Sequence, residues 1–237
     1  MSRNAASGGL SVIVPASNEE AHIDAVLEQV LSLEPLETIV VVNGSTDRTA
    51  EIATARGARV VESAERLGHD VGRAIGASAA RGANLLFVDA DIVIPASDLR
   101  PFAAAVADGH DVALNDIDTL VSRYPWDPVS IQKIWLNACL GRLDLGTASL
   151  TAIPHALGPG AFRHSRPEDL MVPPRAYAKL VRSGADVVKA HTVDVVTTNK
   201  VHDQRVRPDG SDRMTEMIVG DHLEALAWLL GGGRRRR

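Results

Sequence analysis

Short apolar runs alternate with amphipathic segments through the first part of the chain. The runs have the length and β-branched content of buried strands, and they cover residues 10–15, 38–42, 58–62 and 85–89. Apolar residues spaced by three and four positions predict a helix after Asn18, one over residues 48–56 and one over residues 71–81. This alternation predicts an α/β fold with a mostly parallel central sheet and helices on both faces.

The pattern beyond residue 91 is less regular. It predicts helices over 97–107, 129–140, 173–183 and 214–230, and strands near 111–115, 148–153 and 186–196. Two segments lack a clear period: an irregular stretch over 118–128, and a loop over 154–167 that is rich in glycine, proline and histidine. Loops of this length are commonly functional.

Composition narrows the function classes. The 237 residues are 45% hydrophobic and 23% charged, which is typical of a globular protein with a sizeable core. Aromatic residues make up only 3% and the net charge is -5. Because nucleic-acid surfaces use base-stacking aromatics or a broadly basic face, we expect no nucleic-acid partner.

Three features of the sequence bear on the cellular compartment of the protein. Cys139 is the single cysteine, which fits a reducing compartment, and we expect it to be a small buried residue. No apolar run approaches the roughly 20 residues of a membrane-spanning helix, so we expect no transmembrane segment and a cytoplasmic location. Four arginines, Arg234–Arg237, form a basic tail for which a flexible solvated end is favoured. Peripheral contact with anionic lipid at the inner membrane face is the alternative.

The strongest chemical signal is a pair of aspartates at the end of an apolar run. Asp89 and Asp91 follow Leu85–Val88, and ligands bind at the carboxyl ends of strands in alternating α/β proteins. Carboxylate oxygens suit Mg²⁺ or Mn²⁺, which usually bind one or two carboxylates together with substrate phosphates. The pair therefore indicates a metal–diphosphate site, and a solvated strand end is the alternative.

Four stretches that follow strands should meet at one rim of the sheet. They are Val14–Glu20, Asn43–Asp47, Gly68–Arg73 and Asp89–Asp91. Together, and in this order, they resemble the nucleotide-sugar half of family 2 glycosyltransferases with the GT-A fold. The resemblance covers about residues 10–95, and the joint pattern is more specific than any one stretch.

This resemblance implies one GT-A-like domain over 1–237, with a nucleotide-sugar half at about 10–115 and an acceptor half at about 116–230. Residues 231–237 would be a flexible basic tail. The implied activity moves a sugar from a nucleotide diphosphate sugar to a small-molecule or lipid-linked acceptor. A UDP-sugar is favoured as donor, and a GDP-sugar and a homodimer stay open.

The family's donor-site residues carry over to matching positions of this chain. They are Pro15, Ala16, Glu19, Asn43, Gly44, Ser45, Arg73, Asp89 and Ala90. In the family's pattern Asp91 would ligate the metal, and Asp89 would bond the ribose or reach the metal through water. Asn43 stands where relatives usually have an aspartate, and Val42 replaces a preceding aspartate in many members, so the base stays open. The bland alternatives are a turn and helix cap at Asn43–Asp47 and a surface arginine at Arg73.

The acceptor half carries fewer signals. Many inverting relatives place a Glu-Asp pair about where Glu168 and Asp169 stand, which implies Asp169 as the general base, with Glu168 second. Acids that complement a helix N-terminus are the alternative.

Histidines point toward a different outcome. His191–Val195 and Asn199–His202 resemble the late strand and loop of retaining glucosyl-3-phosphoglycerate synthases, which implies His202 as a third metal ligand. His155 and His164 are candidates for binding an acceptor phosphate or carboxylate. Inversion and retention both stay open.

Two other classes compete with this interpretation. A sugar-phosphate nucleotidyltransferase is also α/β and metal-dependent, but it usually carries a glycine-rich basic loop after the first strand, unlike Ala16–Glu19. A non-catalytic nucleotide-binding protein of the same fold is the second alternative.

Overall fold

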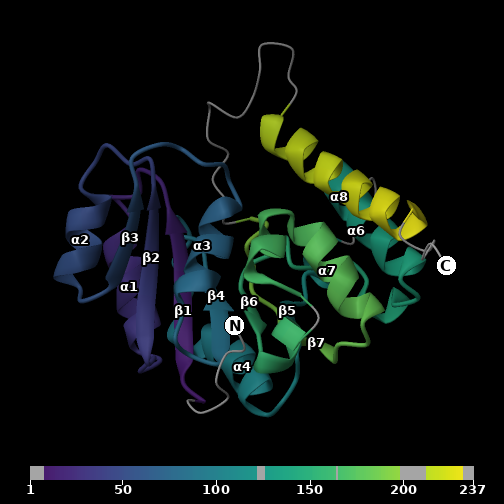
Figure 1. The fold of residues 1–237 in the computed structure, drawn as a ribbon, viewed down its shortest axis with the longest axis horizontal. Coiled ribbons are helices and arrows are strands. Elements are labelled where there is room, and N and C mark those ends of the chain that lie inside the picture. Colours follow the sequence, from purple (N-terminus) through teal and green to yellow (C-terminus); the bar gives the residue numbers. More distant parts are fainter. Residues whose placement is uncertain (1–7, 122–125, 164, 198–211, 232–237) are drawn as a thin grey trace.

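The computed structural model describes residues 8–121, 126–163, 165–197 and 212–231 (Figure 1). Within these residues a seven-stranded sheet has the order β3-β2-β1-β4-β6-β5-β7. Its strands are β1 Leu10–Ala16, β2 Glu37–Asn43, β3 Arg59–Ser63, β4 Asn84–Phe87, β5 Val112–Asn115, β6 His155–Leu157 and β7 Val187–His191. All neighbouring pairs are parallel except the two that β6 makes with β4 and β5. The predicted mostly parallel sheet is confirmed.

Helices connect the strands and cover both faces of the sheet. The α-helices are α1 Ile23–Leu31, α2 Thr49–Ala55, α3 Val71–Ala79, α4 Ala96–Ala107, α5 Asp118–Val121, α6 Pro128–Cys139, α7 Pro173–Arg182 and α8 Arg213–Gly231. Short 3-10 helices span η1 Leu143–Leu145, η2 Pro159–Arg163 and η3 Pro167–Met171. Figure 1 shows α8 lying along α6 and α7 at one end of the molecule.

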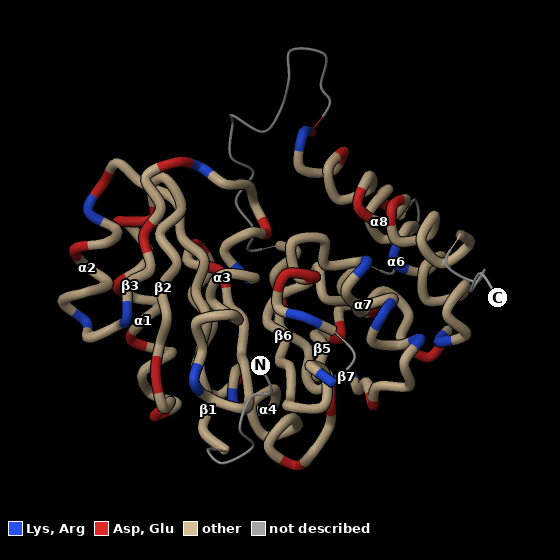
Figure 2. Tube along the Cα trace, viewed as in Figure 1, with Lys and Arg blue, Asp and Glu red and all other residues tan. Residues whose placement is uncertain are grey.

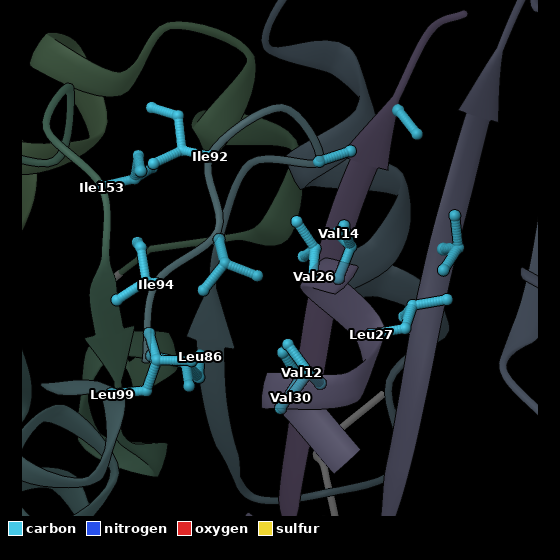
Figure 3. Close-up of a cluster of buried hydrophobic side chains, with 14 of the residues drawn as sticks. Val12, Val14, Val26, Leu27, Val30, Leu86, Ile92, Ile94, Leu99 and Ile153 are labelled. Carbon is cyan, nitrogen blue, oxygen red and sulfur yellow. The ribbon is translucent and has the colours of Figure 1, made fainter. Parts of the chain in front are cut away.

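One hydrophobic cluster lies between the sheet and helices α1, α2 and α4 (Figure 3). Alternate residues of β1, Val12 and Val14, point into it and meet Val26 and Val30 of α1. Because successive side chains of a strand point to opposite faces, the residue between them, Ile13, belongs to the cluster on the other face. Burial on both faces explains why the central strands are almost continuously apolar.

The second cluster lies under α3, α6, α7 and α8. Its largest member is Tyr177 of α7, which is fully buried and donates a hydrogen bond from its hydroxyl to Asn137 Oδ1 of α6 at 2.7 Å. This buried hydrogen bond satisfies the phenol inside the core and links two helices of the acceptor half.

Most predicted elements are found within a few residues of their expected bounds, but the strand predicted over 148–153 is wrong. That stretch forms a turn in which Ser149 Oγ and Thr151 Oγ1 lie 2.6 Å apart and the Ala152 N–H donates to Ser149 O. Hydroxyl side chains offer the backbone such local hydrogen bonds in place of a strand. The actual strand, β6, lies just beyond, inside the predicted loop.

Cys139 is exposed at the end of α6 and is not buried as predicted. In the described part of the chain, no helix has both the length and the apolar character needed to cross a membrane.

Two glycines let α3 pack tightly on the sheet. A Cβ on Gly72 would lie 2.9 Å from Pro15 Cβ at the end of β1, and a Cβ on Gly76 would collide with Ile13 Cγ2. Helix α3 therefore approaches β1 more closely than alanine at either position would allow. This close approach places Arg73, the residue after Gly72, against the rim of the sheet.

Gly76→Ala should therefore destabilise the fold. Overpacking of this kind costs about 1–3 kcal/mol, and a urea titration followed by circular dichroism would measure it. Gly220→Ala in α8 is the matched control, because its added methyl group meets nothing within 4 Å. There the free energy of unfolding should rise by about 0.5–1 kcal/mol. Equal effects at the two glycines would contradict the close approach of α3.

Candidate active site

The loops that follow β1 and β2 are fastened to each other by side-chain hydrogen bonds. The Asn18 N–H donates to Ser45 Oγ at 3.0 Å, and the Thr46 N–H donates back to Asn18 Oδ1 at 2.8 Å. The Glu19 N–H donates to Thr49 Oγ1 at 2.8 Å. Asn18 has a φ of +59°, a conformation that asparagine tolerates better than most residues. The predicted donor residues Glu19 and Ser45 therefore lie on adjoining loops.

Asn43 holds a third loop in place. Its Nδ2 donates to Gly68 O at 2.7 Å, and its Oδ1 accepts from the Leu67 N–H at 2.8 Å. Gly44 has a φ of +65°, and a Cβ there would lie 2.9 Å from Arg66 N. Asn43 is 8% exposed, and its side chain forms hydrogen bonds with the backbone of Leu67 and Gly68. Its predicted contact with a nucleotide base stays a prediction.

Arg73 is the buried centre of the rim, not the surface arginine that was the alternative. Its Nη2 donates to Asp89 Oδ1 at 2.8 Å, and its Nη1 is hydrogen-bonded to Asp70 Oδ1. The arginine is 4% exposed. Burial works against its charge, but the neighbouring carboxylates of Asp89 and Asp70 outweigh burial and raise the pKa of the guanidinium above its ordinary value. The ion pair fixes the orientation of Asp89.

The two aspartates after β4 fit a hard divalent cation. Asp89 keeps 27% of its side chain exposed, and Asp91 is half-buried, while Ala90 between them is buried. In the described part of the chain, no group of three or more histidine, cysteine, aspartate or glutamate side chains is arranged to hold a metal. Two carboxylates whose remaining partners come from substrate phosphates are the usual protein set for Mg²⁺. The donor chemistry therefore fits a metal bound together with a diphosphate.

Helix α8 adds further acids near the ion pair of Arg73 with Asp70 and Asp89. The pKa of Asp221 is raised from 3.8 to about 6, first by burial and then by the negative charges of Asp70 and Glu224, while Arg175 acts in the opposite direction. Arg175 pairs with Glu224 at 2.5 Å. The α8 helix thus brings negative charge toward the start of α3, where Asp70 lies.

Asp169 is engaged in local contacts. Its Oδ1 pairs with Lys179 Nζ at 2.5 Å, and its Oδ2 accepts the Arg166 N–H at 3.0 Å, which closes the first turn of η3. Burial alone would raise its pKa, but these hydrogen bonds lower the pKa below the ordinary aspartate value. Its neighbour Glu168 is exposed. Such contacts are typical of the helix-terminus alternative.

The predicted histidines fall in different places. His155 lies in β6, is fully buried and stacks on Phe87, with 4.9 Å between ring centroids. Burial, and then the positive charge of Arg73, lowers the pKa of His155 to about 3, so the ring is neutral. A buried neutral ring does not fit the predicted contact with an acceptor anion. His164 and His202 lie outside the described residues.

Sequence reasoning missed two residues of this region. Asp70 precedes Arg73 by three positions, and this spacing on a predicted helix was a usable signal for an ion pair. Asp221 carried no such signal, because only tertiary packing brings α8 toward α3.

The sequence matches the model of a known family. The model of the family described as Glycosyl transferase family 2 matches residues 11–134, just over half of the chain. Over 99 residues the chain is 40% identical to a dolichyl-phosphate beta-glucosyltransferase of Drosophila melanogaster, covering 35% of this chain and 30% of that protein. Over 101 residues it is 37% identical to a glucosyl-3-phosphoglycerate synthase of Mycobacterium tuberculosis, covering 36% and 30%. The matches thus span less than a third of these relatives.

Solved structures share the fold over nearly the whole chain. The glucosyl-3-phosphoglycerate synthase of Mycobacterium tuberculosis in complex with Mn²⁺, UDP-glucose and phosphoglyceric acid superposes with a TM-score of 0.66 and 21% identity. The match covers 95% of this chain and 81% of that one. The same enzyme with Mg²⁺ and UDP gives a TM-score of 0.64. This likeness establishes the GT-A architecture of the chain.

The position of Asp221 predicts a pH-dependent stability. Between pH 3.8 and about 6 the folded state holds a proton on Asp221 that the unfolded state releases, so the free energy of unfolding falls as the pH rises through this window. Asp221→Asn removes the carboxylate and with it this loss of stability at high pH. The variant should be more stable than the wild type at pH 8, and its advantage should shrink toward pH 4, as measured by urea titration.

Asp144→Asn is the control with the opposite sign, because its hydrogen bond with Arg142 lowers the pKa of Asp144. That variant should be slightly less stable at pH 8. If Asp221→Asn destabilises the protein at pH 8, the carboxylate is not crowded by the acids around it.

Proposed function

Because this chain belongs to glycosyl transferase family 2, we propose that it transfers a sugar from a UDP-sugar to an acceptor, with Mg²⁺ or Mn²⁺ bound by Asp91 and Asp89. The family match sets aside the alternative of a sugar-phosphate nucleotidyltransferase. The GDP-sugar alternative for the donor stays open.

One observation carries the proposal: Arg73 holds Asp89 at the carboxyl end of β4, two residues before Asp91 and beside the fastened loops of β1 and β2. A metal–diphosphate ligand needs carboxylates fixed in this way, because a rigid carboxylate loses little conformational entropy when it binds. When bound, the cation would offset the negative charge that builds up on the departing nucleoside diphosphate.

The chain's own residues would bind and orient the donor. Pro15, Ala16 and Glu19 would border the base, and Ser45 would lie on the adjoining loop. Asp89 would accept a hydrogen bond from the ribose with the oxygen that Arg73 leaves available, or reach the metal through water. Asp91 would be the direct ligand. His202, the predicted third ligand, would add a neutral nitrogen.

Support for a UDP-sugar comes from relatives. The solved glucosyl-3-phosphoglycerate synthase structures contain UDP or UDP-glucose with Mn²⁺ or Mg²⁺. The names of the relatives point to different acceptors, one a dolichyl phosphate and one a phosphoglycerate. The acceptor is therefore proposed only as a small-molecule or lipid-linked compound.

Asp91→Ala tests the metal site. In the wild type, Mn²⁺ should tighten the binding of UDP at least tenfold in isothermal titration calorimetry, and metal-dependent hydrolysis of UDP-glucose should be detectable. Asp91→Ala should abolish the effect of Mn²⁺ on UDP affinity, because the carboxylate that binds the metal directly is lost.

Asp144→Asn is the matched control, since it removes an exposed aspartate that pairs with Arg142 at 2.8 Å. UDP affinity that is indifferent to Mn²⁺ in the wild type would refute the proposal. Metal-dependent binding without any turnover would favour the non-catalytic alternative.

A second pair of variants tests the predicted general base. If Asp169 removes a proton from the acceptor, Asp169→Asn should lower kcat by 10²-fold or more. If the carboxylate only closes η3 and pairs with Lys179, the variant should unfold at a lower temperature and keep its kcat. Glu168→Gln should be neutral for stability because Glu168 is exposed. Sugar transfer followed by mass spectrometry, with melting curves for each variant, separates these outcomes.

A further inference from the structure

A cavity of about 580 Å³ lies between η3, α7 and the last turns of α8. Three of its lining residues are basic, Arg166, Lys179 and Arg182, and one is acidic, Asp169. Trp228 and Leu229 form an apolar wall. Figure 2 shows basic positions along α7.

The charges that line this cavity do not cancel. The Asp169 carboxylate is taken up by Lys179 Nζ and by the Arg166 N–H. Because hydrogen bonds lower the pKa of Asp169, it stays ionised near neutral pH and balances one of the three cations. Among the described lining residues, two positive charges then remain in excess. Both arginine side chains are exposed, so their guanidinium groups are accessible to a ligand.

The apolar wall of the cavity is packed against the protein core. Trp228 and Leu229 are partly buried and pack against the hydrophobic cluster under α7 and α8. Nearby, Ser183 Oγ donates to Leu180 O at 2.7 Å, which anchors the end of α7 beside Arg182. The cavity thus combines an indole and leucine surface with two exposed guanidinium groups.

We propose that this cavity is a second ligand site, which binds a phosphate group whose carrier has an apolar portion. Guanidinium groups bind phosphate oxygens through paired hydrogen bonds, and two of them can neutralise a dianion. The apolar portion of the ligand would cover Trp228 and Leu229.

The cavity and the donor rim adjoin different parts of α8. Trp228 lies seven residues beyond Asp221 on α8, which corresponds to about 10 Å along the helix axis. Asp221 is the α8 residue that adjoins Asp70 and the rim. Asp169 lines the cavity, but its carboxylate is held by Lys179 and by the Arg166 N–H. The proposal rests on the arginines and the apolar wall, and not on a role of Asp169 as a base.

The phosphate could come from a soluble molecule or from a lipid headgroup. A headgroup source is supported by Leu230, which is 86% exposed at the end of α8. Basic residues next to exposed apolar side chains favour anionic membrane surfaces. Both sources would present the same chemical group to Arg166 and Arg182.

Fluorescence of Trp228 tests the proposal on the full chain. The chain has three tryptophans, and Trp126 and Trp135 are about half exposed, so Phe at both positions leaves Trp228 as the only indole. This protein would be titrated with hexyl phosphate, with vesicles of phosphatidic acid and phosphatidylcholine, and with vesicles of phosphatidylcholine alone.

We expect a saturable change in Trp228 emission with hexyl phosphate or with the anionic vesicles. The combined variant Arg166→Gln and Arg182→Gln should weaken this binding at least tenfold. Arg213→Gln is the matched control, because it removes one exposed arginine from the other end of α8. Melting curves would verify that all variants fold.

Each outcome decides the question. Binding of hexyl phosphate that the double variant weakens supports the site with a soluble ligand. Binding to anionic vesicles alone, lost in the double variant, supports it with a lipid headgroup. No emission change with either probe overturns the proposal, and so does binding that the double variant leaves intact or that Arg213→Gln weakens equally.

Discussion

The buried ion pair of Arg73 with Asp89 and Asp70 is the constraint on which the rim depends. A guanidinium group that is 4% exposed is tolerable only when carboxylates surround it, and removing one partner of such a pair typically costs about 3–5 kcal/mol. Arg73 reaches this position because Gly72 and Gly76 allow α3 to lie close against β1. The packing of one helix thus determines where the first aspartate of the Asp-x-Asp pair points.

Charge balance at the rim explains why a metal would be required. Asp89, Asp91, Asp70 and Asp221 all lie at or near the carboxyl ends of the central strands, and Arg73 is already paired with two of them. A nucleoside diphosphate brings further negative charge to this place. Without a divalent cation between them, the acids would repel the diphosphate, and with one they attract it. The same acids, whose negative charges repel one another in the folded state, would therefore make donor binding metal-dependent.

Much of the fold was predictable because its signals are local. Apolar runs and helical spacing placed most elements, and the Asp-x-Asp pair followed directly from a strand end. The turn at Ser149–Ala152 was missed because its hydroxyl hydrogen bonds compete with strand pairing, and β6 is only three residues long. The interior position of His155 and the approach of Asp221 to Asp70 depend on tertiary packing, which no residue spacing in this chain encodes.

The most direct test of this account is an anomalous difference map from crystals grown with UDP and Mn²⁺. The account predicts a manganese peak about 2 Å from an Asp91 carboxylate oxygen, in contact with the diphosphate and next to Asp89 in its ion pair with Arg73. UDP bound at the rim without manganese, or manganese bound away from these two aspartates, would contradict it.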